Sequence, residues 1–120
     1  HIVICKPPFS ISTPQLFARV NVRKIVRRPD TAGVTAALAA GDLAGVARRM
    51  YNVFEDVLQP RRLAEINEIK SALIDCGALG ASMSGSGPSV FGLFEDGARA
   101  QDACSRLRES YRDVFLCAPQ

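Results

Sequence analysis

The sequence of 120 residues contains a single histidine, His1, and no tryptophan. One histidine excludes histidine-based metal sites and histidine-dependent catalytic triads unless another chain supplies the missing groups. The cysteines never form a close pair, so their spacing matches neither a zinc knuckle nor a CxxC redox centre. We expect them to be small core residues in a reducing compartment; they are Cys5, Cys76, Cys104 and Cys117.

Long hydrophobic runs and a strong charge imbalance are also missing. No apolar run approaches the roughly 20 residues of a membrane-spanning helix, and the N-terminus lacks the layout of a signal peptide. The 15 basic and 12 acidic residues give a net charge of only +3 and are spread along the chain, which disfavours nucleic acid as a partner. We expect one domain, because 120 residues that are 48% hydrophobic can bury a core of their own. We expect it to be cytoplasmic, because the sequence shows neither a membrane-spanning run nor a signal peptide.

The N-terminal quarter predicts a strand and a short helix. Residues 2–5 (IVIC) have the composition of a buried strand. A buried strand that begins at the second residue leads us to expect that the chain is part of a longer protein. A hydroxyl residue followed by Pro14 then predicts a helix start, with the helix running through Val20. The basic residues 23–29 lack helical periodicity and predict a solvated connection.

Three helices are predicted next, each from its cap and its apolar spacing. Asp30 caps the first, which carries Val34, Ala37 and Leu38 inward and ends at Gly41. One continuous apolar stripe predicts a second helix over residues 43–58. Pro60 starts the third, which ends at Gly77 and buries one side; that side consists of Leu63, Ile66, Ile69 and Leu73.

After residue 78 the spacing of the apolar residues changes from helical to alternating. Residues 79–83 alternate as a half-buried strand, with Leu79, Ala81 and Met83 inward, and residues 90–94 form a more apolar one. A helix over residues 97–111 and a strand over 114–117 follow. The order β, helices, β, β, α, β predicts an α+β fold: a ferredoxin-like (split βαβ) four-stranded antiparallel sheet, with extra helices in its first crossover.

Between the two strands lies a glycine loop, residues 84–89 (SGSGPS). Gly85 and Gly87 permit positive φ angles and let a ligand approach the backbone, and such a loop can point N–H groups at an anion. Ser84 and Ser86 add hydroxyl donors. The plain alternative is a hairpin turn, which favours the same residues. No lysine and no helix follow the loop, which excludes a P-loop or a dinucleotide fingerprint.

The run 79–94 (LGASMSGSGPSVFGLF) resembles the third motif of the GHMP kinases. The resemblance implies that residues 1–120 form the C-terminal domain of such a kinase, which packs on its own N-terminal domain. It further implies that ATP and Mg²⁺ are cofactors bound mainly by that absent domain. Ser84, Gly85, Ser86 and Gly87 would then lie close to the transferred phosphate.

Within this superfamily, three further segments resemble the kinases that phosphorylate the 2-hydroxyl of 4-diphosphocytidyl-2-C-methyl-D-erythritol in the non-mevalonate isoprenoid pathway. These segments are residues 6–17 (KPPFSISTPQLF), 28–31 (RPDT) and 52–55 (NVFE). The resemblance implies a small-molecule substrate, a cytidine diphosphate derivative, with Phe17 stacked on the cytosine and Thr13 and Pro14 beside it. Without the resemblance, the helical spacing of the apolar residues would predict that Phe17 fills the core.

The chain departs from these kinases in one respect: it contains no N-terminal phosphate loop of type PxGxGLGGGSS and no region that would supply the catalytic Asp and its companion Lys. We therefore assign no catalytic residue and no metal ligand here, and interpret Asp56 and Asp75 as surface charges. Three alternatives stay open: a homoserine or mevalonate type of GHMP kinase, a non-catalytic ferredoxin-like ligand-binding module, and, disfavoured by charge, a nucleic-acid binder that uses strand aromatics; these are Phe91, Phe94 and Phe115.

Overall fold

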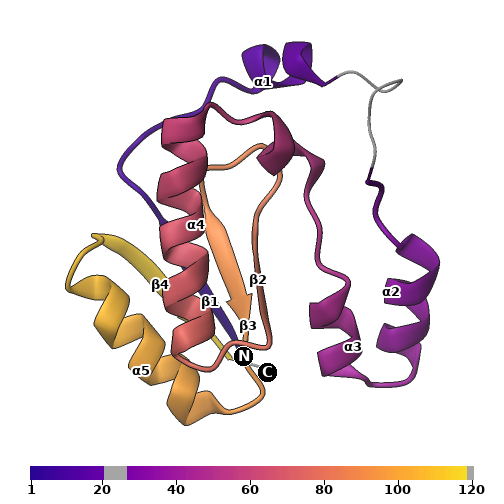
Figure 1. Ribbon diagram of the computed structural model, residues 1–120. Helices are drawn as coiled ribbons and strands as arrows, with labels where there is room; N and C mark the ends of the chain where they lie inside the picture. The colour runs from indigo at the N-terminus through magenta and orange to yellow at the C-terminus, as the bar shows by residue number, and fades with distance from the viewer. Residues whose placement is uncertain (21–26, 119–120) are drawn as a thin grey trace.

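The computed structural model describes residues 1–20 and 27–118. Within them lies one antiparallel sheet of four strands in the order β2-β3-β1-β4 (Figure 1). The strands are β1 Ile2–Lys6, β2 Gly80–Met83, β3 Val90–Leu93 and β4 Asp113–Cys117. This order, with helices in both crossovers, is that of the split βαβ unit. The predicted ferredoxin-like fold is confirmed.

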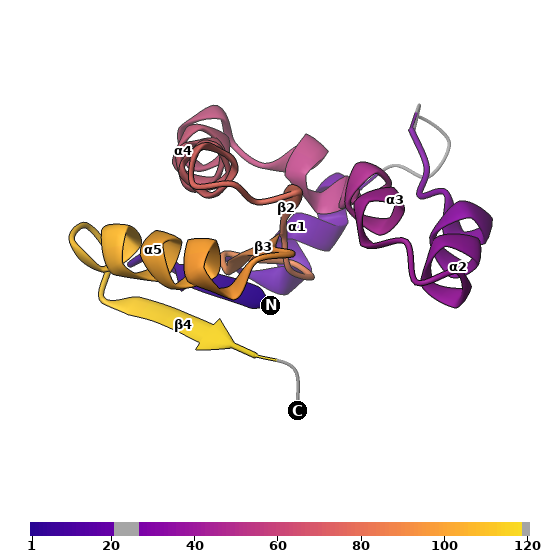
Figure 2. The same cartoon turned by 90° about the horizontal axis from the view of Figure 1, so that it is seen from below.

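Two helices cover one face of the sheet, as the view along the sheet shows (Figure 2). These are α4, Pro60–Asp75, and α5, Gly97–Arg108. Strand β1 is central, and its Val3 and Cys5 are fully buried beneath the helices. The main core joins this strand to both helices; its largest buried side chains include Phe94, Ile66, Ile69, Leu73, Met83 and Val90.

The predicted helix boundaries follow from local chemistry. Pro60 occupies the first turn of α4, where its missing N–H costs nothing, and Gly77 ends this region with a φ of 104°. The Asp96 carboxylate caps α5 by accepting a bond from the Ala98 N–H at 2.8 Å. As predicted, α4 turns Ile66, Ile69 and Leu73 into the core while Leu63 is half-buried.

The first crossover contains α1 Thr13–Arg19, α2 Thr31–Ala39 and α3 Leu43–Arg48. Ser12, Asp30 and Asp42 cap them, at the starts that the sequence predicts. Residues 23–26 of the predicted basic connection lie outside the described residues, whereas residues 27–29 have no regular structure. No helix in the described part of the chain reaches the length and hydrophobicity that crossing a bilayer requires.

The single helix predicted over residues 43–58 is wrong. Helix α3 ends at Arg48, and a separate 3₁₀ helix, η2 Val53–Val57, follows. Asn52 lies between them in an extended conformation, with φ −134° and ψ 112°. Tertiary hydrogen bonds of Asn52 to the glycine loop, described below, stabilise this break, so local spacing alone predicted too long a helix.

Several predicted burial patterns also need correction. Leu38 is 64% exposed, because α2 packs on α3 and buries only a narrow strip around Ala37. In β2 the predicted alternation fails: Leu79 is at the surface, whereas Gly80 and Ser82 are buried. Here α3 lies against the edge strand, and a Cβ on Gly80 would come within 2.8 Å of the Ala47 carbonyl oxygen.

Two of the four cysteines are less buried than predicted, and one strand aromatic is exposed. Cys5 and Cys104 are buried, but Cys76 is half-buried and Cys117 is exposed. Among the strand aromatics, Phe94 is buried and Phe91 half-buried, whereas Phe115 is 54% exposed. The helices cover only one face of the sheet (Figure 2), so outward residues of β4 have nothing above them in the described residues.

Candidate functional site

The glycine loop is a hairpin connection between β2 and β3. The Ser84 N–H donates to the Ser89 carbonyl oxygen at 2.8 Å, and the Gly87 N–H donates to the Ser84 carbonyl oxygen at 2.9 Å. Gly85 and Gly87 have φ angles of 54° and 80°, in the region that glycine adopts at no steric cost. The two glycines are therefore required by the turn itself, whatever the turn binds.

The two glycines have different surroundings. A Cβ on Gly87 would lie 2.5 Å from Met83 Sδ and 3.1 Å from Ile11 Cδ1, so this side of the loop is packed against protein. A Cβ on Gly85 would meet nothing within 4 Å. The N–H groups of Gly85 and Ser86 donate to no acceptor within residues 1–20 and 27–118. The loop thus has open space beside Gly85 and two backbone N–H groups without an acceptor in the described residues, two features that an anion-binding loop needs.

Helix α1 brings the second group of predicted residues to this loop. The hydroxyls of Thr13 and Ser86 lie 2.9 Å apart, although the two residues are 73 positions apart in the sequence. Pro14 occupies the first turn of α1, and Leu16 anchors that helix with only 4% of its surface exposed. The structure therefore places the Thr13 end of α1 against the tip of the glycine loop.

Phe17 lies on the outer side of α1. Its side chain is 60% exposed, which rules out the plain alternative that it fills the core of this domain. It packs in an edge-to-face manner on Phe54, with ring centroids 4.9 Å apart and an interplanar angle of 75°. A large, exposed and positioned aromatic ring is suited to stacking on a flat ligand.

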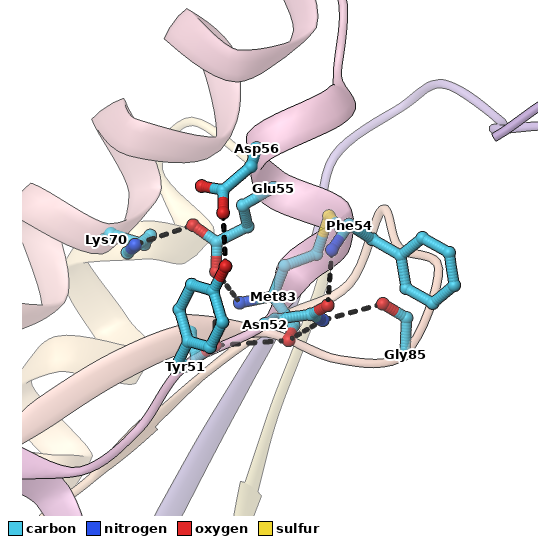
Figure 3. A network of polar contacts seen from close by, with 9 residues as sticks. Tyr51, Asn52, Phe54, Glu55, Asp56, Lys70, Met83 and Gly85 are labelled. Carbon is cyan, nitrogen blue, oxygen red and sulfur yellow. Dashed lines mark hydrogen bonds and ion pairs between the residues drawn. The ribbon is translucent and has the colours of Figure 1, made fainter. Parts of the chain in front are cut away.

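Residues 52–55, which we call the NVFE segment, connect these two groups. Asn52 Nδ2 donates to the carbonyl oxygens of Met83 at 2.7 Å and Gly85 at 2.6 Å (Figure 3). Asn52 Oδ1 accepts a bond from the Phe54 N–H at 3.0 Å. The Asn52 side chain therefore links the start of η2 to the last residue of β2 and to the glycine loop.

Glu55 is the charged member of the NVFE segment and is only 8% exposed. Its carboxylate accepts bonds from Lys70 Nζ at 2.7 Å, Ser82 Oγ at 3.1 Å and the Met83 N–H at 3.1 Å. A buried charge needs such partners, and here a cation, a hydroxyl and a backbone amide supply them (Figure 3). The sequence resemblance drew attention to this segment but gave it no role.

Asp56 and Tyr51 form an exposed pair beside the segment. The Tyr51 hydroxyl donates a short hydrogen bond to Asp56, and this bond raises the pKa of Tyr51 above its ordinary value. The Arg27 guanidinium lies 4.4 Å from the centroid of the same ring. Asp56 and Asp75 are both exposed, in agreement with their interpretation as surface charges.

Comparison with known families matches residues 34–113 to the family model "GHMP kinases C terminal". The match covers α3, η2, α4, α5, most of α2, the glycine loop and strands β2 and β3, whereas α1, β1 and nearly all of β4 lie outside it. The chain belongs to the GHMP kinase family. In this family's terms, residues 34–113 correspond to the C-terminal domain, and the resemblance noted in the glycine loop is confirmed.

Individual GHMP kinases extend the match over nearly the whole chain. A curated 4-diphosphocytidyl-2-C-methyl-D-erythritol kinase of Clostridium botulinum is 44% identical over 96% of this chain. Its counterpart in Clostridium novyi is 41% identical over the same share. The chain spans only 41% of the length of these relatives.

Solved structures of GHMP kinases share the fold. A homoserine kinase from Cytophaga hutchinsonii superposes with a TM-score of 0.75 at 25% identity and covers 98% of this chain. A 4-(cytidine 5'-diphospho)-2C-methyl-D-erythritol kinase gives 0.74 at 25% identity and covers 95%. This chain covers 41% and 40% of those two chains, respectively.

Proposed function

We propose that residues 1–120 form the C-terminal, substrate-side domain of an ATP-dependent kinase that phosphorylates the 2-hydroxyl of 4-diphosphocytidyl-2-C-methyl-D-erythritol. The observation that carries the proposal is the contact of Thr13 with Ser86, which joins a helix with an exposed aromatic ring to a glycine loop with free backbone donors. The 44% identity to kinases of this name supports the choice of substrate.

The arrangement suggests how this domain holds the substrate. The cytosine stacks on Phe17, while Thr13 and Pro14 form the wall beside the base. The diphosphate continues toward the glycine loop, where the N–H groups of Gly85 and Ser86 are available to an anion. Backbone donors fixed before the reaction stabilise developing charge without reorganising, which is the main protein contribution to phosphoryl transfer.

The transfer itself joins the substrate hydroxyl oxygen to the γ-phosphorus of ATP and breaks the bond from that phosphorus to ADP. The hydroxyl proton passes to an acidic residue. We place that residue, and most of the ATP site, in the kinase's own N-terminal domain. ATP and the substrate then meet between two domains, as ligands commonly do.

Mg²⁺ accompanies ATP in this proposal and neutralises charge on the transferred phosphate when bound. Within residues 1–20 and 27–118, no group of three or more His, Cys, Asp or Glu side chains is arranged to hold a metal ion. We therefore assign the metal no ligand in these residues. A cytoplasmic location for the kinase stays a prediction.

The test is a coupled ADP-release assay of the full-length protein with three acceptors: the diphosphocytidyl substrate, homoserine and mevalonate. We expect turnover with the first and none above the acceptor-free control with the others. Homoserine is a necessary competitor, because the homoserine kinase structure superposes as well as the cytidyl kinase. Preferred turnover of homoserine or mevalonate would overturn the proposed substrate.

A further inference from the structure

We propose that the NVFE segment, residues 52–55, positions both halves of the substrate site: Asn52 holds the glycine loop and Phe54 holds the Phe17 ring. This inference rests on the proposed function, because it assigns the loop and the ring to phosphate and cytosine. Neither Asn52 nor Phe54 is assigned a contact with substrate. Both act as positioning residues.

Asn52 has all the hydrogen-bonding capacity that this role needs. Both hydrogens of its Nδ2 are used, one on each of two carbonyl oxygens that flank Ser84. Its Oδ1 accepts from the Phe54 N–H, which fixes the orientation of the amide because the flipped amide would place a donor against a donor. The amide therefore holds the chain on both sides of Ser84, the first residue after β2.

Glu55 holds the NVFE segment, and with it Asn52, in place. The buried carboxylate accepts from the Met83 N–H, while Asn52 Nδ2 donates to the Met83 carbonyl oxygen, so both backbone polar groups of Met83 are held by one segment. The pairing of Glu55 with Lys70 ties the segment to α4. Because α4 is packed into the core through Ile66, Ile69 and Leu73, the loop is held relative to the core of the domain.

Phe54 extends from the same segment toward α1, away from the carboxylate network (Figure 3). Its ring contacts Phe17 at 4.9 Å, and Phe54 is half-buried where Phe17 is exposed. The contact restricts the rotamers of an exposed aromatic that is otherwise free to move. A ring held in one orientation loses less entropy when it stacks on a base.

The Asn52 contact with the loop and the Phe54 contact with Phe17 should affect different kinetic constants. Loss of the Asn52 amide changes the shape of the loop that faces the transferred phosphate, and this lowers kcat. Loss of the Phe54 ring loosens the stacking platform, and this raises KM for the cytidyl substrate. A residue with a merely structural role would instead lower thermal stability and affect both constants and both substrates alike.

The experiment compares Asn52→Ala, Asn52→Asp and Phe54→Leu in the full-length kinase. Asn52→Asp keeps the size of the side chain but turns carboxylate oxygens toward the carbonyls of Met83 and Gly85. We expect kcat to fall about 10-fold in Asn52→Ala and about 100-fold in Asn52→Asp, with KM for the cytidyl substrate within about 3-fold of wild type. Phe54→Leu should raise that KM about 5-fold and keep kcat.

The matched control is Asn67→Asp, which makes the same chemical change at an exposed position of α4. It should leave kcat and both KM values at wild-type levels. If Asn52→Asp fails to fold, the kcat of Asn52→Ala tests the inference. This variant should fold, because water can reach the exposed Gly85 carbonyl oxygen and donate to it in place of the amide.

Three outcomes overturn the inference. The first is an Asn52→Ala variant with wild-type kcat, and the second is an Asn52 series in which Asp is no worse than Ala. The third is a Phe54→Leu variant with unchanged KM for the cytidyl substrate. In each case a wild-type enzyme active on that substrate leaves the proposed function intact. An inactive wild type defeats the proposed function and this inference together.

Discussion

A methyl group at Gly85 is the sharpest probe of whether the glycine loop faces a ligand or is only a turn. Gly85 has a φ of 54°, and a Cβ built on it meets nothing within 4 Å. In Gly85→Ala the folded protein therefore bears the cost of a positive φ, about 1 to 2 kcal/mol, and no steric cost within the described residues. The methyl group instead occupies the open side of the loop.

Gly41 provides a matched control outside the site. It follows α2, has a φ of 68°, and a Cβ on it likewise meets nothing within 4 Å. Gly41→Ala and Gly85→Ala should therefore lose similar stability, measured as the midpoint of thermal unfolding. Only Gly85→Ala should lose activity, because its methyl group stands where we place the phosphate.

The loss of transition-state stabilisation in Gly85→Ala should be about 2 to 4 kcal/mol, comparable to the loss of one oxyanion-hole donor, because the methyl group keeps the phosphate away from the N–H groups of the loop. This corresponds to a fall in kcat/KM of about 30-fold to 1,000-fold. The assay is coupled ADP release by the full-length kinase at saturating ATP. Equal kcat/KM values for Gly85→Ala and Gly41→Ala would refute the reasoning and leave the loop as a hairpin turn.

Three further predictions concern the 120-residue chain alone. It should release no ADP above a protein-free control in the coupled assay, because its sequence contains neither the family's N-terminal phosphate loop nor the region of the catalytic base; measurable turnover would contradict this. Burial raises the pKa of Cys5 from 9.0 to about 12, so iodoacetamide at pH 8 should modify exposed Cys117 but not Cys5, and equal rates would contradict this. For the same reason, the urea concentration at the unfolding midpoint should decrease as the pH rises from 9 to 12. In this range the Cys5 thiol loses its proton in the unfolded state and keeps it in the folded state.

The sheet and the two helices that cover it could be predicted because local and tertiary preferences agree there. Asp96 caps α5 and Gly77 follows α4 at the places where the apolar spacing also begins and ends. Consistency between caps and periodicity is the usual sign of a strongly specified element. The strand order then followed from the order of elements.

The break between α3 and η2 could not be predicted from the same signals. The apolar residues on both sides of Asn52 keep helical spacing, but the Asn52 side chain binds carbonyls at positions 83 and 85. A contact that spans more than 30 positions leaves no trace in local periodicity. The one local hint is that asparagine is a preferred helix cap, which Asn52 is for η2.

The burial of Ser82 had the same cause. Alternation placed it on the exposed side of β2, and Glu55, 27 positions earlier, covers it. The residues proposed for the site came from resemblance rather than from periodicity. Even so, the resemblance did not predict that Thr13 and Ser86 would meet, and this contact is what joins the two groups.

The measurement that tests the account most directly is the KM of full-length Phe17→Ala for the diphosphocytidyl substrate. Stacking on a base is worth about 1 to 3 kcal/mol, so we predict a rise of about 10-fold or more. The KM for ATP should stay unchanged, and Phe17→Tyr, which keeps the π face, should behave as wild type. Because Phe17 is 60% exposed, the melting temperature should change little. A strongly lowered melting temperature, with both KM values raised alike, would contradict the account and make Phe17 a structural residue.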